Sequence, residues 1–242
     1  MSENLPFKIA DGDQQDNAEL KDSKGIIYLS LLQDISKACK KKDPGYVEGA
    51  EPGMFLLSGV NSLLGEETDV IVLDFYKYLV ETNPNDDTQI IGRYPEREGM
   101  KRVSNPGAWS GEWVSEEGNK MTLNYGYVLQ IVGQEDVGKV MFSLKSSGIK
   151  IGQAWNNLLD RKLPSGQTAA TYHQVFTLKS KIQTKGSNSW YVVEPNFKSW
   201  VNQEQYDSAF EVTKTLIPAS EQLKVEDKSS DTETDTKEKV DY

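Results

Sequence analysis

Runs of alternating or continuous apolar residues, separated by turn-forming residues, recur along the middle of this chain. The clearest is residues 69–80 (DVIVLDFYKYLV), which are rich in the β-branched and aromatic residues that strands favour. Residues 83–87 (NPNDD) follow it and form a clear turn signal. We therefore expect a strand before this turn, and runs of similar character predict further strands at residues 54–57, 89–94, 121–132 and 140–144.

A helical period replaces the strand period in two places. Between residues 148 and 162 the apolar positions fall at i, i+4, i+7 and i+8 and so share one helical face. We expect this helix to begin at Ser146 or Ser147, because serine is a favoured N-cap, and to end near Lys162. Residues 203–217 predict a second helix. The apolar face of the first helix is formed by Ile151, Trp155, Leu158 and Leu159.

Other stretches are less regular. Residues 25–32 fit either a buried strand or the start of a helix that continues through Ser36 and Cys39, and periodicity does not decide between them. Residues 62–68 predict a loop. Residues 95–120 hold many glycines and prolines and predict a long irregular segment, a kind of segment that is often functional.

The order of elements favours a mainly β (α+β) fold. Residues 172–183 and 190–194 predict a hairpin around the turn at 185–189, and Gly126 predicts a bulge in the run 121–132. The succession of strands, a central helix, more strands and a late helix is typical of an OB-like barrel. This is the architecture we expect.

Polar segments flank this region. Residues 1–25 are acidic and lack periodicity, so we expect a flexible arm. Residues 26–217 then form a single β-rich domain. Residues 218–242 predict a disordered acidic C-terminal tail, which carries eight acids and four lysines from Glu221 onward and ends in Asp241 and Tyr242.

Composition excludes several classes of protein. No run of about 18 apolar residues is present to span a membrane, and the N-terminus lacks the apolar region of a signal peptide. A single cysteine, Cys39, excludes an internal disulfide and fits a reducing compartment. With His173 as the one histidine, the usual zinc sites are excluded as well. We expect a protein that is not an enzyme, binds no metal or cofactor, and acts in the cytoplasm.

The charge is distributed unevenly. The whole chain carries −10, yet residues 139–185 hold eight basic residues and one acid, Asp160, which sum to +7. Rings lie among these charges. A single nucleic-acid strand needs cations that follow its phosphates and rings on which bases of any identity stack. The alternative is a basic face that balances acids elsewhere, with the rings in the core.

The first interpretation assigns roles to individual residues. Tyr172 and Phe176 share one face of the predicted strand and are the stacking candidates, whereas Trp155 is better explained as core. Trp109 and Trp113 form either a second platform or a pair of buried anchors. The phosphate contacts are assigned to Lys145, Lys150, Arg161, Lys162, Lys179, Lys181 and Lys185.

The acidic tail complements this basic stretch. We expect it to occupy the basic groove when no strand is bound, and to recruit partner proteins through Asp241 and Tyr242 when a strand displaces it. The sequence also allows a homo-oligomer.

Two other functions remain open from the residues alone. A virion or assembly protein would use the basic stretch as a protein interface. A metal-dependent nuclease would need carboxylates that converge on Mg²⁺, ideally near Lys120. The carboxylates available in clusters are Glu66, Glu67, Asp69 and Asp74, and then Glu112, Glu116 and Glu117.

Five segments carry a resemblance to known proteins: residues 28–33 (YLSLLQ), 44–55 (PGYVEGAEPGMF), 142–150 (FSLKSSGIK), 154–158 (AWNNL) and 190–191 (WY). They resemble a family of bacteriophage-encoded proteins, some described as single-stranded DNA-binding proteins of replication or recombination. The resemblance covers about residues 26–200. Together with the acidic tail that ends in an aromatic residue, it implies an OB-type fold, binding without strong sequence preference, contacts to replication or recombination proteins, and action in the host cytoplasm.

Overall fold

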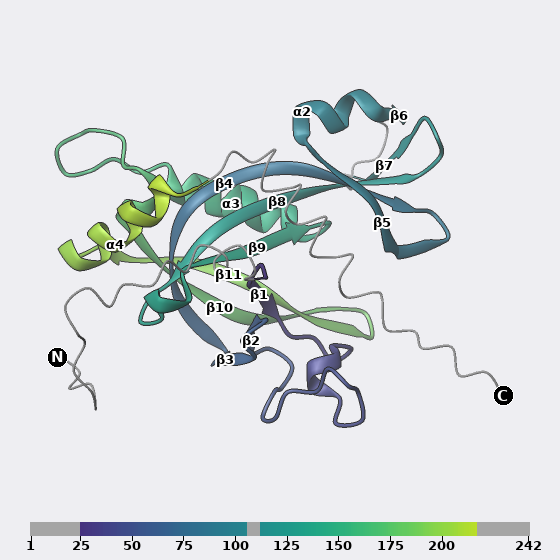
Figure 1. The fold of residues 1–242 in the computed structure, drawn as a ribbon, viewed down its shortest axis with the longest axis horizontal. Helices are drawn as coiled ribbons and strands as arrows, with labels where there is room; N and C mark the ends of the chain where they lie inside the picture. Colours follow the sequence, from purple (N-terminus) through teal and green to yellow (C-terminus); the bar gives the residue numbers. More distant parts are fainter. Residues whose placement is uncertain (1–24, 106–111, 217–242) are drawn as a thin grey trace, which may run out of the picture.

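The computed structural model of this protein describes residues 25–105 and 112–216. In this part of the chain one curled sheet of eleven strands dominates the fold (Figure 1). The strands are β1 (Tyr28–Leu31), β2 (Phe55–Ser58), β3 (Ser62–Gly65), β4 (Glu67–Asn83), β5 (Asp86–Pro95), β6 (Val103–Asn105), β7 (Glu112–Ser115), β8 (Lys120–Ile131), β9 (Lys139–Lys145), β10 (Gln174–Lys185) and β11 (Asn188–Trp200).

Helices connect some of these strands. The two longest in the described chain are α3 (Gly148–Leu159) and α4 (Gln203–Lys214). A single helical turn, α2 (Glu96–Gly99), follows β5. The short 3-10 helices are η1 (Lys37–Cys39), η2 (Met100–Arg102), η3 (Glu135–Val137) and η4 (Thr171–His173).

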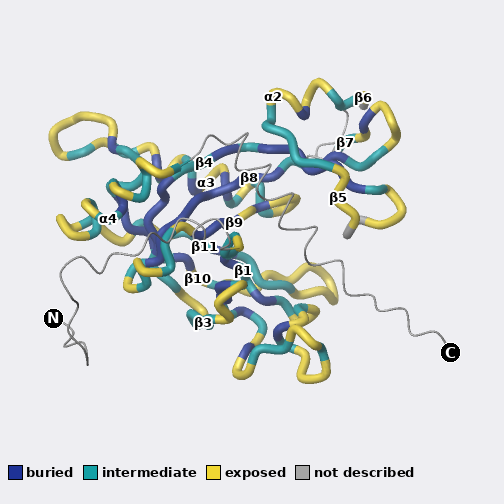
Figure 2. The backbone as a smooth tube through the Cα atoms, viewed as in Figure 1, coloured by how far each residue is buried: buried dark blue, intermediate teal, exposed yellow. Residues whose placement is uncertain are grey.

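Strands β4 and β8 form the spine of the sheet. They pair antiparallel along most of their length, and each has different neighbours in its two halves. The first half of β4 pairs with β10 and the second half with β5. The start of β8 pairs with β7 and the rest with β9, which continues the sheet through a parallel pairing with β1 and then β2 and β3. Many of the buried residues lie along β4 and β8, the two strands of this spine (Figure 2).

Helix α3 packs on one face of the sheet. Its Trp155 is fully buried and stacks on Tyr127 of β8, with ring centroids 4.4 Å apart. The rings of Phe142 and Phe176 meet the same indole edge-on, at 6.3 and 6.0 Å. Burial of several aromatic rings of this size stabilises the fold by several kcal/mol. The prediction that Trp155 belongs to the core is confirmed.

Helix α4 packs on the opposite face. Its buried Ala209 contacts a cluster that includes Ile71, Val128 and Val175, whereas Val70 of β4 belongs to the α3 side, as strand alternation requires. The helix begins with a capping box. Asn202 Oδ1 accepts from the backbone N–H of Gln205 at 2.8 Å, and Gln205 Oε1 accepts from the N–H of Asn202 at 3.0 Å.

The structure confirms the mainly β fold and corrects some elements. Of the two alternatives left open for residues 25–32, the strand is present: Tyr28–Leu31 form β1. Residues 62–68 are not a loop but contain β3 and the start of β4. The predicted irregular segment 95–120 contains α2, η2, β6 and β7. Helix α3 ends at Leu159, and its N-cap Ser147 makes no side-chain capping bond.

Gly126 lies in regular pairing, so the predicted bulge there is wrong. It pairs with Tyr76 and with Ser143, and the register shift between β4 and β8 falls at Val72–Asp74 instead. A side chain at Gly126 would place its Cβ 2.6 Å from the Tyr76 ring. The glycine is therefore explained by close approach of a ring.

An ion pair between a buried carboxylate and a partly exposed guanidinium connects η2 to the far end of the spine. Glu81 of β4 is fully buried, and its carboxylate lies 3.2 Å from the guanidinium of Arg102. The amide of Asn119 donates to the same carboxylate at 2.9 Å. Burial raises the pKa of Glu81, but hydrogen bonds from Asn119, Tyr94 and Ser115 and the charge of Arg102 outweigh it, so the pKa lies below its ordinary value.

Candidate nucleic-acid interface

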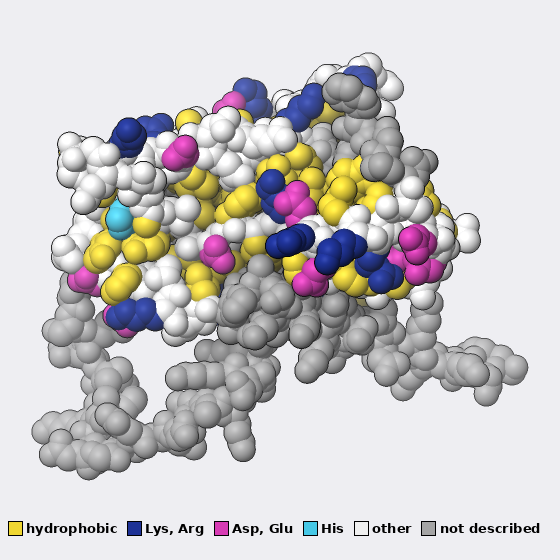
Figure 3. Space-filling view, turned by 90° about the horizontal axis from the view of Figure 1, so that it is seen from above, with side chains coloured by type: hydrophobic (Ala, Val, Ile, Leu, Met, Phe, Trp, Pro, Cys, Tyr) yellow, Lys and Arg dark blue, Asp and Glu magenta, His cyan; other side chains and the backbone are white. Residues whose placement is uncertain are grey.

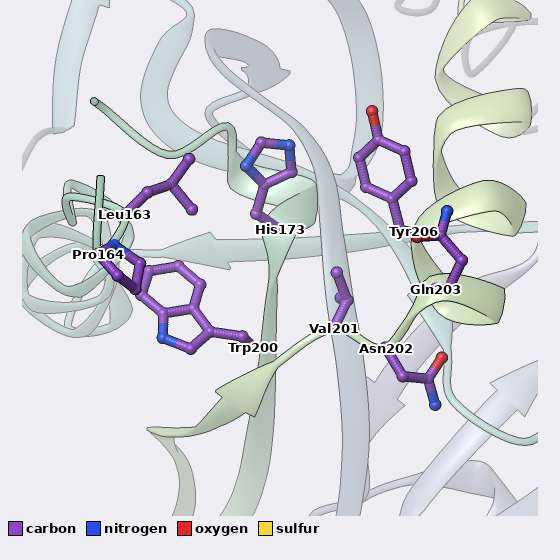
Figure 4. Close-up of a pocket in the computed structure, with 8 residues that line it drawn as sticks. All are labelled: Leu163, Pro164, His173, Trp200, Val201, Asn202, Gln203 and Tyr206. Atoms are coloured by element: carbon purple, nitrogen blue, oxygen red, sulfur yellow. The ribbon is translucent and has the colours of Figure 1, made fainter. Parts of the chain in front are cut away.

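An open pocket of about 500 Å³ lies where the end of β11 meets the start of α4 and the segment after α3. Its size is within the range of small-molecule binding sites. Figure 4 shows the indole of Trp200 beside Leu163 and Pro164, His173 projecting from η4, and Tyr206 projecting from α4. The lining is completed by Val201, Asn202 and Gln203.

Trp200 is the most exposed aromatic side chain of this pocket, and a neighbouring ring holds it in place. Its exposed fraction is 36%, and its ring meets Phe197 edge-on at 5.6 Å. The guanidinium of Arg161 lies over the Phe197 ring, 4.1 Å from its centroid, while Arg161 Nε donates to the carbonyl of Leu158 at 3.0 Å. These contacts hold the permanent positive charge of Arg161 against Phe197, the ring that contacts Trp200.

The opposite side of the pocket is a second set of rings. Tyr172 contacts His173 edge-on at 4.8 Å and Tyr206 at 6.1 Å, and Tyr206 stacks on Phe210 at 5.7 Å. The backbone N–H of Ala170 donates to His173 Nδ1, so a neutral imidazole presents its N–H at Nε2. Burial lowers the pKa of His173, which favours this neutral form at pH 7.

The sequence prediction placed Tyr172 and Phe176 on one strand face, and this is wrong. Tyr172 lies in η4, on the α4 side of the sheet, whereas Phe176 lies in the cluster around α3. The Phe176 ring is fully buried and has no face for a base. The predicted stacking role of Phe176 is therefore corrected to a core role, and Tyr172 supports the pocket by its contact with His173.

The predicted basic residues divide into groups that lie apart in the structure. Arg161 and Lys162 directly precede the pocket residue Leu163. Lys145 lines a different pocket, with Arg93 and Lys120. Lys150 is exposed on α3, and Lys185 is exposed where the β10–β11 hairpin turns.

Lysines of β10 are paired with acids from neighbouring strands. Lys179 Nζ lies 3.0 Å from Glu67, and Lys181 Nζ lies 2.7 Å from Glu194. Lys198 of β11 pairs in the same way with Asp69. Basic and acidic side chains therefore alternate on the surface, as they also do in the view of Figure 3. The +7 stretch does not form one continuous basic groove among the described residues.

Sequence reasoning missed Trp200 and Tyr206 as pocket residues. It ended the last strand at Glu194, whereas β11 continues to Trp200. The spacing of Val193, Pro195 and Phe197 at every second position was the signal that the strand continues.

Other predicted residues have different outcomes. Asp241, Tyr242 and Trp109 lie outside the described residues, and Trp113 lies in β7. Within ranges 25–105 and 112–216 no group of three or more His, Cys, Asp or Glu side chains is arranged to hold a metal ion. The same ranges contain no helix with the length and hydropathy that crossing a membrane requires.

None of the curated proteins compared with the chain matches it, and none of the solved structures does. A family model does match, over residues 5–222, and its description is Pam3 phage gp34-like protein. This match spans most of the 242 residues, so the chain belongs to the Pam3 phage gp34-like family of phage proteins.

Proposed function

We propose that this protein binds single-stranded DNA during phage replication or recombination, without strong sequence preference. The observation that carries the proposal is the pocket in which Trp200, His173 and Tyr206 surround one open space. The Arg161 guanidinium is held over the ring of Phe197, which in turn contacts Trp200. A base would enter this space and stack on Trp200. The family of phage proteins to which the chain belongs supports this setting.

The pocket matches the chemistry of a strand better than that of a duplex. Only an unpaired base presents both ring faces, and stacking on an aromatic side chain stabilises binding by about 1–3 kcal/mol per base whatever its identity. Arg161 and Lys162 would contact the adjoining phosphates. Each such contact releases counterions, so the affinity falls as salt rises, with a logarithmic slope of roughly −0.7 per phosphate for single strands.

The architecture is compatible with an OB-like barrel. The sheet curls so far that Gln33, just after β1, reaches the backbone of β11. An OB barrel closes in a comparable way, and its sheet and loops bind single strands. In this proposal the exposed cations Lys145, Lys150 and Lys185 extend the path of the strand, and the acidic tail with Asp241 and Tyr242 recruits replication or recombination proteins.

Fluorescence anisotropy with a labelled oligo-dT of about 30 nucleotides, at two salt concentrations and beside a duplex, tests the proposal. Trp200→Leu should weaken strand binding about tenfold, because it removes a stacking surface. Trp190→Leu is the matched control, since Trp190 lies on the same strand but outside the pocket. Absence of strand binding at low salt would overturn the proposal and favour a virion or assembly protein. An equal loss in both variants would place the contact elsewhere.

A further inference from the structure

A second pocket, of about 380 Å³, lies on the sheet face that also carries α4. It crosses five strands, from Tyr28 of β1 through β9, β8 and β4 to Arg93 of β5. Tyr78 and Val80 in its lining belong to the same face as the α4 contacts. The pocket is therefore a hollow in the sheet surface itself, which is a rigid support for a ligand.

Asn124 of β8 is a buried amide in this pocket with one half of its hydrogen bonding unmet. Its exposed fraction is 8%, and its Nδ2 donates to the hydroxyl of Tyr78 at 3.4 Å. The Tyr78 hydroxyl is in turn 2.9 Å from Ser143 Oγ. Asn124 Oδ1 has no hydrogen-bond partner within the described part of the chain. A buried acceptor of this kind is costly unless a water or a ligand supplies a donor.

The rest of the polar lining fits an anion. Arg93, Lys120 and Lys145 contribute three positive charges from β5, β8 and β9, and Thr122 adds a hydroxyl. No carboxylate occurs among the described residues that line the pocket. In a protein that carries −10 overall, three basic side chains therefore meet in one pocket, and Arg93 and Lys120 each have a further interaction in the fold. Phosphate, like carboxylate, is an anion that Arg and Lys side chains recognise, and its several oxygens can contact three cations at once.

We propose that this pocket binds one nucleotide unit: its phosphate on Arg93, Lys120 and Lys145, and an N–H or O–H of its base or sugar donating to Asn124 Oδ1. The cations and the amide together define the ligand. Inorganic phosphate can contact the three cations, but it is too small to reach Asn124 Oδ1 at the same time and supply the hydrogen-bond donor that this oxygen lacks. The unit is either a free nucleotide or part of a strand. The proposal does not depend on the aromatic pocket, which shares no lining residue with this one.

Isothermal titration of the full chain with deoxycytidine 5′-monophosphate, deoxycytidine and inorganic phosphate tests the site. The monophosphate should bind at least tenfold more tightly than either of the other two. Asn124→Leu should weaken it about tenfold, because a buried hydrogen bond to the ligand is lost, while the apolar isostere removes an unmet acceptor and preserves folding. Lys145→Gln, an exposed substitution, should weaken it by a similar factor.

Two matched variants serve as controls. Gln130→Leu removes another buried amide with an unpaired oxygen, outside this pocket, and Lys139→Gln removes the lysine at the other end of β9. Neither should change nucleotide affinity. Equal effects of Asn124→Leu and Gln130→Leu, or equal binding of phosphate and nucleotide, would overturn the proposal in favour of a general anion patch.

The two sources of the nucleotide unit are separated by a competition experiment. If Asn124→Leu weakens the binding of a dC oligonucleotide as well as that of the free monophosphate, the unit belongs to a strand. If Asn124→Leu weakens only the monophosphate and leaves the oligonucleotide affinity unchanged, the ligand is a free nucleotide. If neither monophosphate nor oligonucleotide affinity responds to Asn124→Leu and Lys145→Gln, the site does not exist.

Discussion

The side-chain amide of Gln33 forms two hydrogen bonds with the backbone of Tyr191. Gln33 Nε2 donates to the carbonyl of Tyr191 at 3.0 Å, and the N–H of Tyr191 donates to Gln33 Oε1 at 2.9 Å. The amide thus reproduces the two bonds that a neighbouring strand would make. It connects the segment after β1 with β11, the strand at one edge of the sheet, and so fixes the curl.

Replacement of this amide should loosen the closure of the sheet. Gln33→Leu removes both hydrogen bonds from partly buried backbone groups and should lower the free energy of unfolding by about 2 kcal/mol. Urea denaturation followed by circular dichroism measures the change. Gln183→Leu, an exposed glutamine of β10, is the control and should change stability little. An unchanged midpoint for Gln33→Leu would show that the closure does not depend on this contact.

Gly53 lies against the same tyrosine, and its substitution tests the close approach. Its φ is +90°, and a Cβ at this position would lie 2.6 Å from the Tyr191 ring. Gly53→Ala should therefore destabilise the fold by more than the roughly 1 kcal/mol that a positive φ alone costs a residue with a side chain. Gly49→Ala is a matched control, because Gly49 has a φ of +78° but its nearest neighbour is 3.8 Å away.

Thermal unfolding of both glycine variants separates the two effects. The control should show only the backbone cost, and Gly53→Ala should show that cost plus the displacement of Tyr191. Equal shifts in melting temperature would mean that the ring moves without penalty and that the Gln33 contact tolerates the movement.

Phe176 has a stacking role in the sequence prediction and a core role in the structure, and its substitution tests which role it has. Because its ring packs on Trp155 and Phe197 in the core, Phe176→Leu should lower the free energy of unfolding by about 1–2 kcal/mol. Single-strand affinity, measured well below the melting temperature, should stay the same. A loss of affinity without a loss of stability would restore the stacking role that the sequence predicted.

Strands of this fold were predictable where the pattern is local. Residues 69–80 have a strand composition that needs no partner to be recognised, and β4 indeed covers them. Pairing has no such signal. The parallel pairing of Tyr28 with Met141 joins residues far apart in the sequence, and the change of partner along β4 from β10 to β5 depends on the whole sheet. The branching of the sheet was therefore not predictable.

The candidate site was less predictable, and two physical reasons explain why. The net charge of a sequence segment does not count acidic residues that lie far away in the sequence but next to the segment in the fold. Glu67, which pairs with Lys179, is such a residue. The last strand was predicted over residues 190–194, just before Pro195, yet β11 continues through this proline, because an edge strand does not need the N–H that proline lacks. The strand therefore continues to Trp200, the residue on which the aromatic pocket depends. Arg161 and Lys162 directly precede Leu163 of that pocket in the sequence, and their phosphate contacts stay a prediction.

The ion pair of the buried Glu81 with the partly exposed Arg102 should make stability depend on pH at the acidic end. The pKa of Glu81 in the folded protein lies below its ordinary value of 4.5. The charged carboxylate therefore stabilises the fold above that value, and this stabilisation is lost as the pH falls through the lower, folded-state pKa. The slope from this one group is at most about 1.4 kcal/mol per pH unit.

Glu81→Gln removes the titrating carboxylate and therefore tests whether Glu81 causes the pH dependence of stability. At neutral pH the variant should be less stable by about 3 kcal/mol, because Arg102 loses a buried partner. Its stability should then fall less steeply than that of the unmodified protein between about pH 5 and about pH 3. Urea denaturation at several pH values measures both effects. Glu116→Gln, on an exposed turn, should retain the full acid dependence. Parallel pH profiles for the Glu81 variant and the unmodified protein would assign the acid sensitivity to other carboxylates.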